Sequence, residues 1–404
     1  MPKILIETAI SDALDRLSIL DVKQKKIENK EKQVHILYEK GILENKLKEY
    51  TNKVSYYYKI LILINEKIWD LLDQAKYSNE FGIHNELFKE KQLDLFKEQE
   101  DYNERRFRVK RKIDNILNSD IKEQKGYHKA QALVLGHLGM GDMLDVTGLI
   151  RYLSTKYDKV VVIAKSNYSL KNIKQMFSDD NTIEILQVKD DRAISPAYGA
   201  SPQVFNTMFK NYDQYLLGFH QHGLRHVFKS DDLPFSFYDD VQIPHNVYWD
   251  YFHVNVPRKS KELYNMLNEK NISNYIFVHN SCSFGEIFDY KYIEEKLNTN
   301  KNEVLFINPC KNMYDENHKY FELAEKMKDH LLLDYVDLIE NADSVIVTDS
   351  GFFSLCIHLK INTDKCYFFS RENDTYNYEY EHIWSDKNKS NDKTYKKFIQ
   401  INKN

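Results

Sequence analysis

The chain has 404 residues and a nearly balanced charge, with 57 Lys and Arg against 61 Asp and Glu and a net charge of −4. This balance gives no support for a protein that binds nucleic acid or an anionic membrane through its overall charge. The length exceeds the ~250–300 residues at which one hydrophobic core stops growing, which predicts two or three domains.

The composition also bears on location and redox state. No apolar run approaches the ~20 residues of a membrane-spanning helix, and the first residues become charged too soon for a signal peptide. We therefore expect a cytoplasmic protein without a transmembrane segment. The cysteines form no C-x-x-C pair, which argues against a zinc knuckle or a disulfide framework. They are Cys282, Cys310, Cys356 and Cys366.

The first third of the sequence predicts helices. Ser11 is the expected N-cap of the first helix. A second helix carries a heptad repeat, which must pack against another helix. The first helix and a third one around residues 107–116 are the expected partners, and a dimer through the same repeat is the alternative. The repeat consists of Leu43, Leu47, Tyr50, Val54, Tyr57, Leu61, Ile64, Ile68 and Leu71.

The third helix carries a run of basic residues. Two interpretations are open: a solvated face beside acidic neighbours, or a surface that binds an anionic acceptor or a lipid headgroup. The run comprises Arg105, Arg106, Arg108, Lys110, Arg111 and Lys112. The segments Pro2–Lys23, Ile68–Asp70 and Asn103–Arg106 resemble an uncharacterised helical family of bacterial small proteins, which implies a helical domain over residues 1–125.

The stretch 132–153 predicts a strand, a glycine turn and a helix. Its glycines follow the order G-x-x-G-x-G, the reverse of the dinucleotide-binding fingerprint, which disfavours a nicotinamide or flavin site. Asp142 falls where the strand ends and the helix begins, the edge at which open α/β sheets present ligands. Its carboxylate can cap the helix or take part in chemistry. Asp145, one turn further on, is expected to be structural.

Further apolar runs predict buried parallel strands in two doubly wound domains. Pro257 and the basic run 258–261 are expected to form the hinge between them, which gives domains over 126–257 and 258–404 with a ligand cleft between them. The predicted strands are 159–165, 182–188, 214–220, 275–279, 303–308, 330–334, 344–348 and 365–370.

A second turn, Asp349-Ser350-Gly351, leads from a strand into a helix that we expect to continue through Leu359. A helix that starts here would point backbone N–H groups and a positive dipole end at the cleft. The pair of turns therefore predicts an anion site in the later domain opposite Asp142 in the earlier one.

Both turns resemble signatures of the ADP-heptose lipopolysaccharide heptosyltransferases. The segment Gly139–Leu153 is similar to their opening motif, and Ala342–Gly351 to their A-D, strand and Asp-Thr-Gly signature; the resemblance covers residues 130–375. It implies a GT-B fold with two Rossmann-like domains, an inverting mechanism, a nucleotide-sugar donor and no catalytic metal or cofactor. It also implies Asp142 as general base and Asp349, Ser350 and Gly351 at the donor phosphates.

The sequence departs from these signatures at several positions. Gly148 replaces the usual Pro, Ser354 stands where His is frequent, and the expected Lys-x-Trp-Pro segment is missing after His279. The reaction type therefore carries over better than the sugar. The remaining residues expected on the donor side are Ser281, Ser283, Asn308, Lys311 and Arg371, and those on the acceptor and phosphate turn are Gly139, Met140, Gly141, His220 and His222.

Alternatives from other classes stay open at this stage. The spacing of His220, His222 and His226 could hold zinc, although metal-free catalysis is what the resemblance implies. A nucleotide-sugar epimerase could use the same fold. A non-catalytic glycan-binding or scaffolding protein could act through the helical domain, with self-association through its heptad repeat. The expected partners are a nucleotide-diphosphate sugar and a glycan or glycolipid acceptor.

Overall fold

The computed structural model describes residues 7–80, 86–124, 130–136, 139–165, 168–189, 208–218, 233–282, 285–369 and 398–401. The chain divides into two compact units, one of residues 1–130 with 153–159 and one of residues 131–152 with 160–404. Each unit is described by itself below. No helix in the described ranges is long and apolar enough to cross a membrane. The domain boundaries expected after residues 125 and 257 remain predictions.

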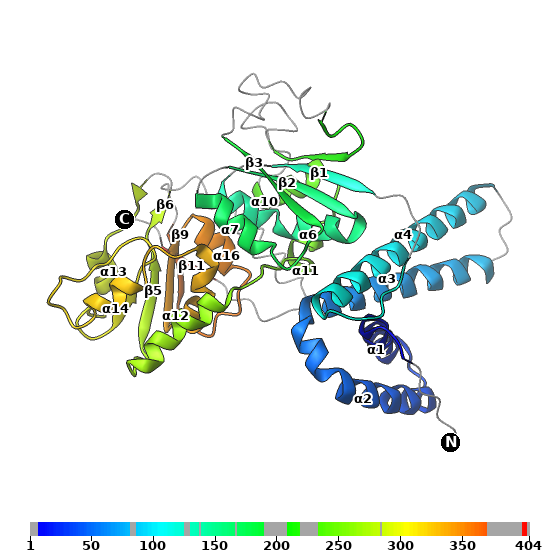
Figure 1. Cartoon of the computed structure of the whole chain (residues 1–404), viewed down its shortest axis with the longest axis horizontal. Coiled ribbons are helices and arrows are strands. Elements are labelled where there is room, and N and C mark those ends of the chain that lie inside the picture. Colours follow the sequence, from blue (N-terminus) through cyan, green and yellow to red (C-terminus); the bar gives the residue numbers. More distant parts are fainter. Residues whose placement is uncertain are drawn as a thin grey trace. The chain divides into compact units, whose positions relative to one another are not determined.

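The first unit is built from four long helices (Figure 1). They are α1 (Ile10–Lys26), α2 (Lys30–Lys53), α3 (Ser55–Glu80) and α4 (Glu86–Ile116). Helix α3 packs against both α1 and α4 and buries the heptad-repeat residues from Tyr57 to Leu71, and Val54 before it is buried as well. The expected single helix from Leu43 to Leu71 is wrong, because the helix is interrupted at Val54.

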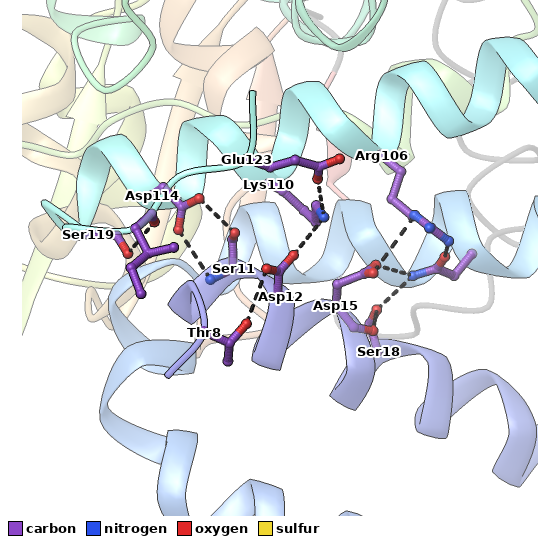
Figure 2. Close-up of polar contacts among 12 residues, drawn as sticks. Thr8, Ser11, Asp12, Asp15, Ser18, Arg106, Lys110, Asp114, Ser119 and Glu123 are labelled. Atoms are coloured by element: carbon purple, nitrogen blue, oxygen red, sulfur yellow. Dashed lines mark hydrogen bonds and ion pairs between the residues drawn. The ribbon is translucent and has the colours of Figure 1, made fainter. Parts of the chain in front are cut away.

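Polar side chains tie α1, α3 and α4 together in the interior of this unit. Ser11 donates to Asp114 at 2.7 Å, and Asn65 on α3 donates to Asp15 at 2.9 Å. Figure 2 shows side chains of α1 facing those of α4, with Lys110 against Asp12 at 2.7 Å. Ser11 is thus not the N-cap, since α1 begins at Ile10 and Ser11 is fully buried.

The basic run on α4 is a solvated face only in part, since Arg111 is exposed and other members are buried. Arg105, Lys110 and Lys112 are buried. Arg108 lies 3.4 Å from Asp158, and the charges of Arg105 and Lys110 are paired with Asp101 and Asp12. A buried charge is costly unless it is paired, so these residues hold the unit together rather than facing an acceptor.

One face of α2 remains apolar and exposed within the described part of the chain. Its only buried side chains are Ile36 and Leu47, whereas Val34 and Tyr38 are 66% and 71% exposed. Leu37 and Ile42 lie on the same stretch and are also exposed. The spacing places these four side chains on adjoining turns of the helix.

The second unit contains two parallel sheets (Figure 1). The first has the order β3-β2-β1-β4, and its strands are β1 (Gln131–Leu135), β2 (Lys159–Lys165), β3 (Ile183–Val188) and β4 (Asp213–Leu216). Strand β1 pairs with β4 and β2 with β3, both in parallel. Helices α5 (Met140–Asp145) and α6 (Thr147–Lys156) follow β1.

The strand order of this sheet reverses at β1. Two strands are added on one side of β1 and β4 on the other. Ligands of open α/β sheets bind outside the carboxyl ends of the strands at such a switch point. The glycine turn that leads from β1 into α5 lies at this point.

The second sheet is parallel throughout, in the order β8-β5-β9-β10-β11. Numbered along the chain this is 2-1-3-4-5, a doubly wound order whose switch point lies between β5 and β9. The strands are β5 (Tyr275–His279), β8 (Leu305–Ile307), β9 (Ser344–Thr348), β10 (Cys366–Phe369) and β11 (Ile399–Ile401). The predicted bounds of β2, β5 and β9 are confirmed.

Shorter elements connect and cover the two sheets. The basic run at 258–261 is not a free hinge, because it forms the first turn of α12 (Arg258–Glu269). The other helices are α7 (Tyr168–Met176), α10 (Leu233–Asp240), α11 (Asn246–Asp250), α13 (Tyr290–Leu297), α14 (Phe321–Lys326), α15 (Val336–Glu340) and α16 (Gly351–Cys356). A small antiparallel pair, β6 (Ser281–Cys282) and β7 (Gly285–Glu286), follows β5.

The predicted strand at 330–334 is wrong, because residues Leu332–Tyr335 form a 3₁₀ helix, η3. The side chain of Asp334 accepts a hydrogen bond from the Leu331 amide at 3.0 Å, which closes a tight turn. The Leu332 amide donates to the buried side chain of Asn172 on α7 at 2.7 Å. The leucines are therefore buried by a turn that fastens η3 to α7.

Arg151 of the opening motif connects neighbouring segments of the chain. Its side chain is fully buried, and its guanidinium donates to Asp179 at 2.7 Å and to the carbonyl oxygens of Met176 and His253. Burial pushes the pKa of Asp179 up, but the hydrogen bonds from His253 and Arg151 and the Arg151 charge outweigh it and hold that pKa below its usual range. Arg151 thus joins α6 to the segments around 176–180 and 253.

Gly148 is required by close packing. A Cβ atom at this position would lie 2.6 Å from the carbonyl oxygen of Val247 and 3.1 Å from the hydroxyl of Tyr238. Because both neighbours are buried, we expect Gly148→Ala to lower the free energy of unfolding by about 1–3 kcal/mol, the usual cost of overpacking. Urea unfolding measures this change. The control is Gly136→Ala, where the new Cβ meets only Leu217 at 3.6 Å. Equal stability of the two variants would contradict the prediction.

Candidate active site

The first turn places Asp142 at the carboxyl end of β1. Asp142 is the third residue of α5 and is half-buried. Its carboxylate folds back over Gly139, so closely that a Cβ atom on residue 139 would overlap Asp142 Oδ2. The absence of a side chain at Gly139 therefore fixes where this carboxylate can lie.

The second turn follows β9 at the switch point of the other sheet. Ser350 is the N-cap residue of α16, yet its side chain makes no capping hydrogen bond. Its Oγ lies 3.1 Å from Nδ1 of His279 and 3.1 Å from the carbonyl oxygen of Thr348. Helix α16 ends at Cys356, so the helix expected to continue through Leu359 is shorter than predicted.

The two turns contact each other. Helices α5 and α16 pack together, and a Cβ atom on Gly141 would lie 3.5 Å from Ser354 Oγ and 3.9 Å from the Gly351 amide nitrogen. A Cβ on Gly351 would lie 3.2 Å from Cγ of Met140. The contact is tight at Gly351, over which the Met140 side chain lies, whereas a Cβ on Gly141 would meet Ser354 at ordinary van der Waals distance. The structure therefore brings Met140 and Gly141 beside Gly351, with Asp142 on the same helix as the first two and Ser350 next to Gly351 in the sequence.

His279 is the buried side chain that contacts the Ser350 hydroxyl. It ends β5, pairs in register with Val347 of β9 and is 7% exposed. Its ring packs against Phe352, with 4.4 Å between ring centroids. Burial lowers the pKa of His279 to about 4, so the ring is neutral at physiological pH.

Two of the residues expected on the donor side are engaged elsewhere. The side-chain amide of Asn308 donates to Asn280 at 2.9 Å and its oxygen accepts from the Cys310 amide. Lys311 Nζ lies 2.7 Å from both carboxylate oxygens of Glu286. Ser281 lies on β6, opposite Glu286. Within the described part of the chain, these contacts do not join Asn308, Lys311 or Ser281 to Ser350.

Asp349 directly follows β9, and its backbone amide donates to the Phe369 carbonyl oxygen at 3.3 Å. The other predicted residues divide into two groups. Asp145 is buried at the end of α5, with the Tyr248 hydroxyl 3.5 Å from its carboxylate. Ser283, His220, His222 and Arg371 lie outside the described residues. Within the described ranges, no group of three or more His, Cys, Asp or Glu side chains could hold a metal ion.

Sequence reasoning missed His279 as a site residue and named it only as the last residue of a strand. A titratable side chain at the end of a buried, apolar strand was the available signal. It could not be used, because pairing with Ser350 depends on β5 and β9 being neighbours in the sheet.

Comparisons with known proteins add little. No protein-family model and no curated protein matches the sequence. One solved structure with some similarity is a glycosyl transferase family 9 protein from Veillonella parvula DSM 2008, at 8% identity and a TM-score of 0.39, covering 68% of this chain and 86% of that one. Another is the iron-containing dodecameric glycosyltransferase TibC from enterotoxigenic E. coli H10407, at 13% identity and a TM-score of 0.35, covering 62% and 61%. Likeness at this level carries no inference about fold or activity.

The lowered pKa of His279 predicts a loss of stability in acid. Between the usual His pKa of ~6.5 and about 4, the unfolded chain takes up a proton that the folded chain does not. The free energy of unfolding should therefore fall by up to about 3 kcal/mol as the pH drops from 7 to 4. Urea unfolding of wild type and His279→Asn across this range isolates the effect. Parallel pH profiles would contradict the prediction.

Proposed function

We propose that the protein is a glycosyltransferase that moves a sugar from a nucleotide-diphosphate donor to a hydroxyl of a glycan or glycolipid, with inversion and with Asp142 as general base. The observation that carries the proposal is the contact between two glycine turns, each at the switch point of its own parallel sheet. Ligands of such sheets bind at these points. A ligand bound at this edge would touch both α5 and α16.

The arrangement suits the chemistry of sugar transfer. An acceptor hydroxyl must lose its proton while it attacks the anomeric carbon, and the nucleoside diphosphate leaves from the opposite face. Asp142 would take the proton, since an aspartate with a pKa near ~3.9 is ionised at neutral pH. General-base assistance of this kind contributes ~10²–10⁴-fold in rate.

The donor would be held from the other side of the contact. Ser350 offers a hydroxyl, and the absence of a side chain at Gly351 leaves the backbone accessible to a phosphate once Met140 moves. A methionine suits this movement, because its unbranched side chain adopts many rotamers at small cost. Helix α16 has only six residues, so its dipole supplies little of the stabilisation, and the turn itself carries more of the proposal.

A binding screen is the first experiment. Thermal shifts against UDP-, GDP-, ADP- and CMP-sugars test for a nucleotide-sugar site, because a ligand at ~100 times its dissociation constant stabilises the folded state by ~2.7 kcal/mol. A stabilising donor is then tested with and without glycan acceptors. Conversion of the donor sugar without an acceptor would instead indicate an epimerase, and no shift with any donor would favour the scaffolding alternative.

Replacing Asp142 tests the base directly. We expect Asp142→Asn and Asp142→Ala to lower the rate of transfer ~10²–10⁴-fold, because the acceptor hydroxyl loses its proton acceptor. Donor affinity should stay within a few-fold, since the carboxylate does not hold the donor. Initial rates and isothermal titration with the identified donor measure the two effects. Turnover at the wild-type rate by either variant would remove Asp142 from this role.

Gly139→Ala tests the position of the same carboxylate without removing it. The new Cβ would overlap Asp142 Oδ2 and force the carboxylate to rotate away from its observed position. We expect a loss of at least ~10²-fold in transfer, approaching that of Asp142→Ala, since a displaced group is out of reach of its proton. Gly136→Ala is the control in the same connection. Full activity of Gly139→Ala would show that the observed position is not the catalytic one.

A further inference from the structure

The hydroxyl of Ser350 does not form the hydrogen bond that is usual for an N-cap serine. Such residues normally accept a hydrogen bond from the first turn of their helix. Ser350 makes no such bond, and its backbone is extended, with φ −162° and ψ 175°. Its Oγ lies instead 3.1 Å from Nδ1 of His279, the last residue of the neighbouring strand β5.

The proton count fixes the direction of these bonds. A serine hydroxyl has one hydrogen to donate, and a carbonyl oxygen can only accept. Because Ser350 Oγ lies 3.1 Å from the Thr348 carbonyl oxygen, its hydrogen is assigned to that bond. His279 must then donate from Nδ1. A neutral imidazole protonated on Nδ1 meets this requirement, and burial of the ring keeps it neutral.

We propose that His279 is a positioning residue for Ser350, which it holds by an Nδ1–H···Oγ hydrogen bond while the serine hydroxyl turns from Thr348 to an anionic phosphate oxygen of the ligand. This rests on the proposed function, since the donor supplies the phosphate. Donation from His279 polarises the hydroxyl and strengthens its own donation. The ring is locked in place by Phe352 on one side and by its position in the sheet.

A neutral histidine suits this buried position better than a charged side chain. A protonated ring would cost the energy of a buried charge. A neutral ring gives one fixed donor at no such cost. Ser350 is thereby held ready for a phosphate before the ligand arrives, which reduces the entropy lost on binding.

Binding of inorganic pyrophosphate to the full chain tests this role, measured by isothermal titration. We expect Ser350→Ala and His279→Leu each to weaken binding about tenfold, equivalent to ~1.4 kcal/mol. His279→Asn should bind within about threefold of wild type, because its amide can donate from a similar position; a threefold change is well under that energy. The double variant Ser350→Ala/His279→Leu should be no weaker than Ser350→Ala.

Several results would overturn the proposal: wild-type affinity in His279→Leu, a further tenfold loss in the double variant, or no saturable binding to the wild type. A nitrogen-15 NMR spectrum of labelled histidines gives a second readout that does not depend on folding of His279→Leu. It should show His279 in the Nδ1–H form and a shift in Ser350→Ala; the Nε2–H form would also overturn the proposal. Pyrophosphate binding without sugar transfer from any donor would instead contradict the proposed function and leave the positioning role supported.

Discussion

The candidate site depends on one constraint, the close approach of the α5 and α16 backbones at the switch points of two parallel sheets. Each sheet can present a ligand only where its strand order reverses, at the carboxyl ends of β1 and β5–β9. At this contact the absence of a side chain at Gly351 leaves room for Met140. Within the first turn, the absence of a side chain at Gly139 leaves room for the Asp142 carboxylate. The roles proposed for Asp142 and Ser350 depend on the contact between α5 and α16.

The units are stabilised by buried polar groups as well as by apolar packing. In the helical unit, Asp114 and Asn65 bind partners on α1, and in the other unit Arg151 binds Asp179. Removing one member of such a set leaves the other buried and unpaired, which costs more than the net value of the bond. These contacts therefore make it costly to separate the segments that they join.

Most of the strands could be predicted from the sequence, but the turns and side-chain contacts between elements could not. Runs such as 344–348 are apolar on both faces and surrounded by polar turns, which is enough to identify a buried parallel strand. Leu331–Leu333 has the same composition, yet the side chain of Asp334 closes a turn there, a local bond that periodicity does not reveal. The buried charges of α4 were missed for a similar reason, because a basic run looks solvated until its partners elsewhere in the fold, such as Asp12 and Asp158, are known. Asp142 and Ser350 could be located from motifs, whereas His279 needed the strand order.

The distribution of charge around the second turn shapes how a diphosphate could be held. The ammonium of Lys311 is neutralised by Glu286, and α16 is too short to have a strong dipole. Neither supplies the positive charge that an isolated phosphate site usually has. Neutral donors then matter more, and in a buried site they are effective because they are already oriented and cost no reorganisation. A serine fixed by an uncharged histidine is such a donor. Among the described residues, oriented hydrogen bonds would therefore stabilise the leaving group, which makes the orientation of Ser350 important.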